Sequence, residues 1–291
     1  MKLINGGIII MKNKIIQGNS LNFINKIICG DHLKIIKNIP DNAIHLTVTS
    51  PPYDNLRNYE GYIFEYKKLI PELFRVTILG GVVVWVVGDQ TKEGSESGTS
   101  FKQALYFMEC GFKLHDTMIY KKTVSPFPEN NRYYQIFEYM FIFSKGKPST
   151  VNLIKDRINI HTGQRIRGTQ RQKDGSLKIK EGRVKEKKIK YKGIRHNIWE
   201  YKTGKYKVTK DLIAYEHPAI FPDKLAFDHI RSWSNEGDIV FNPMCGSGTT
   251  CKVAKNNNRR FIGIDCSKKY CEISRERINN NPLFDEVRKS D

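Results

Sequence analysis

The stretch DIVFNPMCGSGTT, residues 238–250, joins an apolar run to a glycine turn and then to a segment that favours a helix. Residues 238–241 predict a buried strand, and residues 251–255 continue as the helix. A glycine turn at this junction lets a ligand come close to the backbone, while the helix N-terminus favours negative charge. The stretch therefore predicts a ligand-binding loop built around Gly246 and Gly248.

The residues that follow extend this unit by one more strand. Residues 261–264 are apolar and end in Asp265, where a second strand offers a carboxylate to a ribose diol. A strand, a glycine turn, a helix, a second strand and an acid form the nucleotide-binding half of a doubly wound sheet. The spacing does not fit a nicotinamide fingerprint, because Cys251 stands where the third glycine belongs.

A second motif, TSPPY at residues 49–53, follows another strand-like run at residues 44–48. The two prolines remove two N–H donors, so the carbonyl groups beside them are left as acceptors. Together with the Ser50 hydroxyl and the Tyr53 ring, they suit an exocyclic amino group on a flat base. The plainer interpretation is a strand that ends in a Pro-Pro turn beside a core tyrosine. The glycine loop elsewhere in the chain favours the functional interpretation.

The rest of the chain alternates strand-like and helix-like segments. Helix candidates separate the strand candidates; one spans residues 100–110 with Thr99 or Ser100 as its cap, and Ser267 caps the last helix. Such alternation predicts an α/β fold with a mainly parallel sheet covered on both faces. Residues 146–212 interrupt the alternation. The additional strand candidates are residues 26–29, 82–87, 117–120 and 139–143.

Charge is distributed unevenly along this chain. The net charge is +19 over 291 residues, and residues 145–210 hold 21 Lys and Arg against 5 Asp and Glu. A basic surface this concentrated favours a phosphate backbone as partner, with an attraction that weakens as salt rises. The alternatives are a solvated lysine-rich face and genome codon bias, but codon bias predicts lysine spread along the whole chain. The expected nucleic-acid contacts include four residues, here called the basic cluster: Lys185, Lys187, Lys188 and Lys190.

Cysteine spacing and hydropathy bear on metal sites and compartment. The six cysteines form no Cys-x-x-Cys pair and have no paired histidines, so neither a metal site nor a disulfide framework is expected. A reducing cytoplasm follows as the expected location. The apolar run at residues 8–10 is too short to span a membrane, and no membrane partner is expected. Met11 is an alternative start to Met1.

In these motifs the chain resembles the DNA amino-methyltransferases that use S-adenosylmethionine, in the β order, where the catalytic motif precedes the cofactor motif. The resemblance covers most of the chain, and residues 137–145 and 197–200 are also similar to family landmarks. It implies a Rossmann-like fold in which residues 1–145 form the catalytic half and residues 213–291 the cofactor-binding half. Residues 146–212 would be a target-recognition insert. Double-stranded DNA is the implied partner, a restriction endonuclease often acts separately beside such enzymes, and monomer and homodimer are both open.

The resemblance also implies roles for individual residues. The implied catalytic residues are Ser50, Pro51, Pro52 and Tyr53. Asp31 resembles the acidic turn that contacts adenine, and residues 217–225 resemble the segment that closes over the methionine part of the cofactor. The family usually has Asp-Pro-Phe where residues 242–244 read Asn-Pro-Met, so the cofactor loses an aromatic neighbour and a charge there. The remaining implied cofactor contacts are Phe221, Lys224, Asn242, Pro243, Met244, Gly246, Gly248, Thr249 and Asp265.

Other polar residues near the motifs are weaker candidates. Asp54, Arg57 and Tyr59 follow the catalytic tyrosine, where they either touch the flipped nucleotide and its phosphate or form a structural salt bridge. Asp89 follows the strand candidate at residues 82–87 and is expected at the carboxyl edge of the sheet, where both motif loops should also lie. His217 is expected to fix its loop rather than act as a base.

Several reactions compete at this stage. A carbon-5 cytosine methyltransferase needs a cysteine nucleophile, usually after a proline, and the chain has no Pro-Cys pair. An RNA or protein-glutamine enzyme uses a similar loop, often with Asn in place of Ser50, and a catalytically degenerate DNA-binding module is the non-enzymatic alternative. Serine at this position resembles the N4-cytosine subgroup and aspartate the N6-adenine subgroup. N4 of cytosine is therefore favoured, with N6 of adenine as the alternative.

Overall fold

The computed structural model describes residues 9–11, 14–16, 22–54, 64–123, 131–164, 169–179 and 188–280. The chain forms two compact units, a larger one of Met1–Asn152 with Asn197–Asp291 and a smaller one of Leu153–His196. The smaller unit spans fewer residues than the predicted insert of residues 146–212. At one end, the Asn152 N–H donates to the Ser232 carbonyl within the larger unit at 2.8 Å. At the other end, strand β14 (Ile198–Tyr201) pairs with the main sheet.

The larger unit is built on a mainly parallel sheet, as predicted. Among the described residues the sheet has eight strands in the order β14-β8-β9-β5-β4-β15-β16-β3. Strand β9 runs antiparallel to β5 and β8, and the other neighbouring strands pair in parallel. The strands are β3 (Lys26–Cys29), β4 (Ile44–Thr49), β5 (Thr77–Val87), β8 (Lys113–Lys122), β9 (Phe137–Ser144), β15 (Ile239–Asn242) and β16 (Arg260–Asp265).

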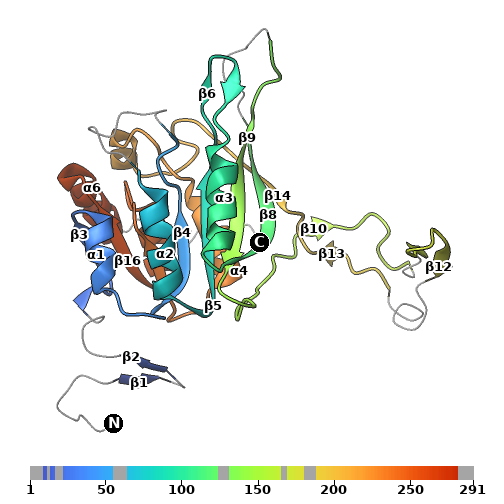
Figure 1. Ribbon diagram of the computed structural model, residues 1–291, viewed down its shortest axis with the longest axis horizontal. Coiled ribbons are helices and arrows are strands. Elements are labelled where there is room, and N and C mark those ends of the chain that lie inside the picture. Colours follow the sequence, from blue (N-terminus) through green and yellow to red (C-terminus); the bar gives the residue numbers. More distant parts are fainter. Residues whose placement is uncertain are drawn as a thin grey trace. The chain divides into compact units, whose positions relative to one another are not determined.

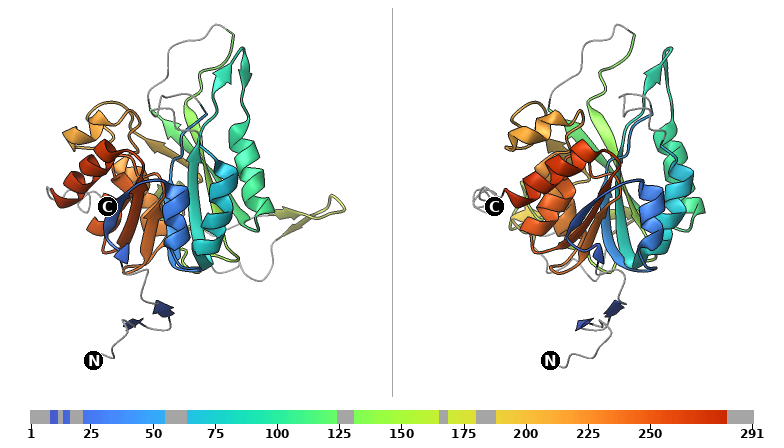
Figure 2. Two further views of the ribbon diagram at one scale, coloured as in Figure 1. Left: turned by 60° about the vertical axis from the view of Figure 1, so that its left-hand side comes forward. Right: turned by 90° about the vertical axis from the view of Figure 1, so that its left-hand side faces the viewer.

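Helices cover both faces of this sheet (Figure 2). One layer holds α1 (His32–Ile35), the 3-10 helix η2 (Ile36–Asn38), α2 (Tyr66–Val76) and α3 (Thr99–Glu109). The other layer holds α4 (Asp223–Trp233), α5 (Thr249–Asn256) and α6 (Lys268–Asn279), and the 3-10 helix η3 (Leu212–Glu216) precedes α4. No helix within the described ranges is long and apolar enough to cross a membrane.

The aromatic core lies between the sheet and the α2–α3 layer. The Phe107 ring stacks on the Phe143 ring at 4.1 Å between centroids, and Trp85 meets Phe107 edge to face at 5.0 Å. Trp85 is fully buried, and its indole N–H donates to Gln103 at 2.8 Å. This packing joins the strand that carries residues 82–87 to helix α3.

Helix ends follow the sequence in one case and depart from it in another. Ser267 caps α6 as predicted, because its hydroxyl accepts the Tyr270 N–H at 3.4 Å. The prediction that Thr99 or Ser100 caps α3 is wrong, since Gly98 holds that position. The Asp89 carboxylate instead accepts the Ser100 N–H at 2.8 Å. An acid from the end of β5 therefore satisfies a donor that a local cap would otherwise take.

The smaller unit and two short hairpins contain the remaining strands among the described residues. In the smaller unit, β10 (Arg157–Ile158) pairs with β13 (Lys192–Gly193), and β11 (Thr169–Arg171) pairs with β12 (Leu177–Ile179). Arg195 forms an ion pair with Asp156 inside this unit. Elsewhere the short pairs are β1 (Ile9–Met11) with β2 (Lys14–Ile16) and β6 (Thr91–Lys92) with β7 (Ser95–Glu96).

Both sequence motifs follow neighbouring strands of the main sheet. The TSPPY motif begins at the end of β4 (Figure 1). The glycine loop follows β15, which pairs in parallel with β4. Asp265 ends β16, the next strand along. Because the carboxyl ends of parallel strands meet at one edge, these three segments come together there, where open α/β sheets bind ligands.

Candidate active site

A cavity of about 610 Å³ opens at this edge of the sheet. Its volume lies within the range typical of small-molecule pockets. The predicted catalytic residues Ser50, Pro51, Pro52 and Tyr53 form one part of the lining. The rest of the wall includes predicted cofactor contacts, namely Phe221, Asn242, Pro243, Met244, Gly246, Thr249 and Asp265.

The glycine loop has no room for side chains at its two glycines. Gly246 has φ +51°, and a Cβ there would lie 2.8 Å from His217 Nε2. Gly248 has φ +78°, and a Cβ there would lie 2.8 Å from the Ser274 Cβ. Positive φ and close neighbours together require glycine at both positions. The backbone of the loop therefore packs closely between helix α6 and the segment that contains His217.

His217 holds the segment that forms one wall of the cavity. The Ala219 N–H donates to His217 Nδ1 at 3.1 Å, and the imidazole meets the Tyr270 ring edge to face at 4.3 Å. These contacts agree with the expectation that His217 fixes its loop. Phe221, two residues beyond Ala219, lines the same cavity.

The Asp265 carboxylate is shared between the two loops that flank it. It accepts the Gly246 N–H at 2.8 Å and the Ser267 N–H at 3.0 Å. Burial raises the pKa of Asp265, while these backbone N–H groups act in the opposite direction. Each carboxylate oxygen has a second lone-pair site, so the acid also has acceptor capacity for a ligand hydroxyl.

Asn242 and Met244, which depart from the family pattern, are integrated into the loop. Asn242 Oδ1 accepts the Thr49 hydroxyl at 2.9 Å and the Met244 N–H at 3.1 Å. Its Nδ2 group donates to the Thr250 hydroxyl at 3.2 Å. The neutral amide thus joins the end of β4 to the glycine loop, and Met244 packs against the apolar core.

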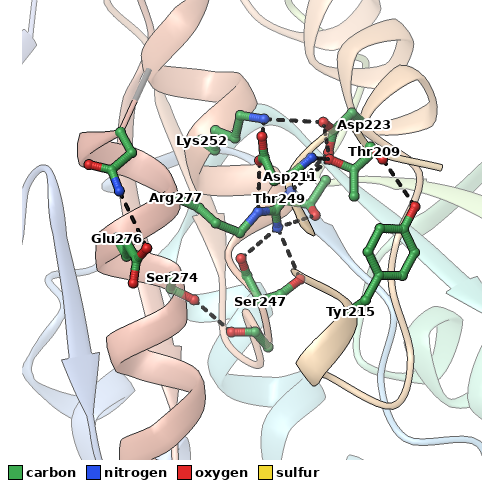
Figure 3. A network of polar contacts seen from close by, with 12 residues as sticks. Thr209, Asp211, Tyr215, Asp223, Ser247, Thr249, Lys252, Ser274, Glu276 and Arg277 are labelled. Carbon is green, nitrogen blue, oxygen red and sulfur yellow. Dashed lines mark hydrogen bonds and ion pairs between the residues drawn. The ribbon is translucent and has the colours of Figure 1, made fainter. Parts of the chain in front are cut away.

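A buried ionic network lies beneath the glycine loop (Figure 3). The Arg277 side chain is 0% exposed, and its Nη1 donates to the Ser247 carbonyl at 2.6 Å and to the Thr249 hydroxyl at 2.9 Å. Its Nε donates to Asp211 Oδ2 at 2.9 Å. Lys252 joins the network through an ion pair with Asp211 at 2.6 Å.

The same network reaches helix α4 through Asp223. Arg277 Nη2 and Lys252 Nζ each lie 3.2 Å from this carboxylate. Burial opposes ionisation of Asp211, but Lys252 and Arg277 outweigh it and lower the pKa of that carboxyl. The cations therefore connect the glycine loop to the chain on both sides of His217. The sequence analysis missed this network, because charged residues on helices are ordinarily solvated.

The TSPPY loop faces a group of polar residues from neighbouring strands. The Ser50 and Tyr53 hydroxyls are 2.8 Å apart, and the Tyr53 hydroxyl donates to Glu138 Oε2 at 2.8 Å. Burial and the negative charge of Glu138 raise the pKa of Tyr53 well above its usual value. Lys122 Nζ lies 2.6 Å from Glu138 Oε1. All four residues line the cavity.

Several lining residues were not predicted from sequence. Glu138 lies in a segment that resembles a family landmark, but nothing in its spacing pointed to the cavity. Thr203 Oγ1 is enclosed and makes no hydrogen bond to any part of the chain that the structure describes. Such a hydroxyl is available to a ligand. The other unpredicted lining residues with polar side chains are His32, Tyr120, Lys122, Ser247, Thr250, Cys266, Ser267 and Tyr270.

Three predicted cofactor contacts do not line the cavity. The Asp31 carboxylate caps α1 by accepting the Leu33 N–H at 2.8 Å, although the next residue, His32, does line it. Lys224 Nζ lies 3.3 Å from Asp228 Oδ1 and 4.8 Å from the centre of the Phe227 ring. Gly248 does not line the cavity either, and a Cβ there would lie 2.8 Å from the Ser274 Cβ.

Of the weaker candidates, Asp54 and Asp89 have structural contacts, and others lie outside the described residues. Asp54 Oδ2 accepts the Ser97 hydroxyl at 2.6 Å, and Asp89 also accepts that hydroxyl at 3.1 Å. The two acids therefore hold the entry to helix α3. Arg57, Tyr59, Lys185 and Lys187 lie outside the described residues, whereas Lys188 and Lys190 are exposed in the smaller unit.

The sequence of this chain matches a known protein family and its members. The DNA methylase family of N6 and N4 methyltransferases matches residues 44–276. The chain belongs to this family. It is 60% identical to the orphan methyltransferase M.BamHII of Bacillus amyloliquefaciens over 84% of this chain and 92% of the relative. It is therefore a DNA amino-methyltransferase that takes its methyl group from S-adenosylmethionine.

More distant relatives share the architecture. The chain is 25% identical to the DNA adenine methyltransferase YhdJ of Escherichia coli, over 84% of this chain and 79% of the relative. The solved structure of the PvuII DNA methyltransferase, which is cytosine-N4-specific, matches with a TM-score of 0.63 at 18% identity. That match covers 91% of this chain and 89% of the solved chain. It confirms the predicted methyltransferase fold.

The residues at the sheet edge fit S-adenosylmethionine. The glycine loop lets a ligand come close to the backbone at Gly246. The Asp265 carboxylate offers an acceptor for ribose hydroxyls, and the Thr203 hydroxyl, which has no hydrogen-bond partner among the described residues, offers a further polar contact. When bound, the cofactor supplies an electrophilic methyl group on a sulfonium. The TSPPY loop follows the neighbouring strand β4, so one wall of the cavity suits the cofactor and another suits the base.

Proposed function

We propose that this DNA methyltransferase acts on N4 of cytosine. The observation that carries the proposal is the Ser50 hydroxyl in the wall of the cavity, beside Pro51, Pro52 and the Tyr53 ring. Serine at this position resembles the N4-cytosine subgroup, while N6-adenine enzymes more often have aspartate. A hydroxyl and a prolyl carbonyl together accept the two hydrogens of an amino group.

Lys122 and Glu138 support cytosine as the base. Next to its amino group cytosine presents the ring nitrogen N3 as an acceptor, followed by the carbonyl oxygen O2, whereas adenine presents N1 followed by a C–H. The Lys122 ammonium has three donors and lines the cavity, so it can serve adjacent acceptors. The carboxylate of Glu138 keeps this ammonium at the cavity wall, at 2.6 Å.

N6 of adenine is the second candidate. The likeness to the adenine methyltransferase YhdJ favours it, because that relative covers most of this chain. Both bases present an exocyclic amino group beside a ring nitrogen, so the same loop serves either. The proposal therefore distinguishes the two through Ser50 and Lys122 and not through the cofactor side of the cavity.

The residues of the TSPPY loop carry out the following steps in the proposed mechanism. The base leaves the duplex and enters the cavity, where the Tyr53 ring stacks on it. Ser50 and a prolyl carbonyl accept both amino hydrogens and take the nitrogen lone pair out of conjugation with the ring. Positioning would then align that lone pair with the sulfonium–methyl bond of a cofactor held by the Gly246 loop and Asp265, so that the N–C bond forms as the S–C bond breaks and the neutral thioether leaves. The proton leaves to Ser50 or to water.

The smaller unit is the proposed contact for the DNA backbone. Residues 145–210 carry the charge excess, and the described lysines of the basic cluster, Lys188 and Lys190, are exposed in that unit. Exposed lysines attract phosphates without reading sequence. Arg57, which follows the catalytic loop, belongs to the same proposal.

Product analysis tests the choice of base. The protein is incubated with labelled S-adenosylmethionine and mixed-sequence DNA, the DNA is digested to nucleosides, and the methylated species is identified by mass spectrometry. We expect N4-methylcytosine. A product of N6-methyladenine alone would overturn the cytosine assignment while leaving the mechanism standing. Ser50→Ala is the matched variant, with cofactor binding retained and turnover reduced by about 10² or more.

A further inference from the structure

Ser50, Tyr53, Glu138 and Lys122 form a continuous polar chain along one wall of the cavity. The Ser50 and Tyr53 oxygens lie 2.8 Å apart, Tyr53 donates to Glu138 Oε2 at 2.8 Å, and Lys122 lies 2.6 Å from Glu138 Oε1. The Glu138 side chain is 16% exposed. The chain begins at β4, crosses to β9 and ends at β8, so it joins residues 85 positions apart.

The direction of each hydrogen bond follows from counting hydrogens. An ionised carboxylate only accepts, so the single phenol hydrogen of Tyr53 points to Glu138. Burial and the charge of Glu138 raise the pKa of Tyr53, which keeps that hydrogen in place. Because Tyr53 has no second hydrogen, the 2.8 Å contact with Ser50 must be donated by the Ser50 hydroxyl.

The serine is thereby left with lone pairs and no hydrogen for the cavity. An exocyclic amino group only donates hydrogens, so it requires an acceptor. We infer that Glu138 is a positioning residue for the methyl transfer: acting through Tyr53, it fixes the Ser50 hydroxyl as an acceptor for the target amino group. This inference rests on the proposed contact between Ser50 and that group, and it holds for cytosine and adenine alike.

A glutamine in place of Glu138 would reverse this order. The amide has one oxygen, and the Lys122 ammonium, as a pure donor, would take it. The NH₂ group would then face Tyr53 and donate to it. Tyr53 would donate to Ser50, and the Ser50 hydrogen would point into the cavity against the amino hydrogens. Shape is preserved in this variant while the direction of the hydrogen bonds is inverted.

Two substitutions of Glu138 separate hydrogen-bond direction from shape. Glu138→Asp keeps a carboxylate that cannot donate, although it is shorter, whereas Glu138→Gln keeps the length. We expect single-turnover methyl transfer to mixed-sequence DNA to fall by about tenfold or more in E138Q and by less in E138D. A structural role based on shape predicts the opposite order. Wild-type turnover in E138Q, or E138Q faster than E138D, would overturn the inference.

A double-mutant cycle tests whether the effect passes through Tyr53. Tyr53→Phe keeps the ring but removes the connecting hydroxyl, so adding E138Q to Y53F should change the rate by less than about twofold. The same fold loss in both backgrounds would refute the connection. Cofactor affinity, measured by calorimetry, should stay within about twofold of wild type in each variant, since the chain lies on the base side of the cavity.

Glu200→Gln is the matched control. Glu200 lies on β14, and its carboxylate is 2.6 Å from the ammonium of Lys121, next to Lys122 in sequence. Its side chain is 54% exposed, and it does not line the cavity. E200Q should turn over like wild type. Ser50→Ala separates this inference from its premise: wild-type turnover in S50A would remove the proposed contact itself, whereas an inactive S50A beside a fully active E138Q would refute only the role of Glu138.

Discussion

Replacing Arg277 with methionine should strongly destabilise the protein. Methionine fits the space and the helix, but it removes every donor that the guanidinium supplies to the network beneath the glycine loop. The side chain is 0% exposed, so water cannot replace those donors. The Ser247 carbonyl and the Thr249 hydroxyl would each lose a partner.

The expected loss in the free energy of unfolding depends on which buried charges keep a partner. Breaking a buried ion pair from one side typically costs about 3–5 kcal/mol, because the other charge stays buried. Lys252 remains 2.6 Å from Asp211 and 3.2 Å from Asp223, so neither acid is left alone. We therefore expect the lower end, about 3 kcal/mol, out of a total near 5–15 kcal/mol for such a protein.

Urea unfolding followed by tryptophan fluorescence measures the change. Arg275→Met is the matched control, because Arg275 lies on the same helix, is exposed, and donates to the Ile27 carbonyl at 2.9 Å. Its loss should be about 1 kcal/mol, the usual net value of one hydrogen bond. If both variants lose the same free energy of unfolding, the network does not carry the stability assigned to it.

Three further predictions concern the cofactor, acid stability and DNA. Asp265→Ala should weaken S-adenosylmethionine binding by roughly 1.5–3 kcal/mol in calorimetry; unchanged affinity would leave Asp265 with only its backbone contacts. The lowered pKa of Asp211 means that its stabilisation is present above the ordinary value of 3.8 and is lost as pH falls through the lower folded value. The stability gap between wild type and Asp211→Asn should therefore shrink below about pH 4, and a gap independent of pH would contradict this. Replacing the basic cluster with glutamine should flatten the plot of log DNA affinity against log salt by up to ~4 units; an unchanged slope would show that the cluster does not touch DNA.

The elements that carry strong local signals could be predicted from the sequence. The strand predicted at residues 238–241 formed at residues 239–242, because its apolar, partly β-branched residues favour an extended, buried backbone. The glycine turn behind it formed a loop as expected, because glycine accepts the positive φ that Gly246 and Gly248 adopt. Ser267 capped its helix as expected, because a serine hydroxyl can accept a backbone N–H from the first turn. Each motif also follows a predicted strand of one parallel sheet, and the carboxyl ends of such strands lie at one edge. Ser50 and Asp265 therefore line the same cavity.

Strand order and segment boundaries could not be predicted in this way. Residues 146–212 contain little apolar periodicity, yet Ile198–Tyr201 return to the sheet beside β8. Hydrogen bonds between distant strands decide this pairing, and they leave no pattern in the segment itself. The Asp89 carboxylate, which follows β5, accepts the Ser100 N–H at the start of α3, where Thr99 or Ser100 had been expected to cap the helix.

Charged residues show the same division most clearly. The family resemblance implied that Lys224 contacts the cofactor, and in the fold its ammonium pairs with Asp228, four residues along its own helix. Arg277 looked like one more helix surface residue, and it is fully buried because Asp211 and Ser247 arrive from other segments. Glu138 meets Tyr53 only because β9 runs antiparallel beside β5. Local residue chemistry thus determines which groups can bind a base or a cofactor, whereas strand register decides which of them face one another, since register brings together side chains that are far apart along the chain.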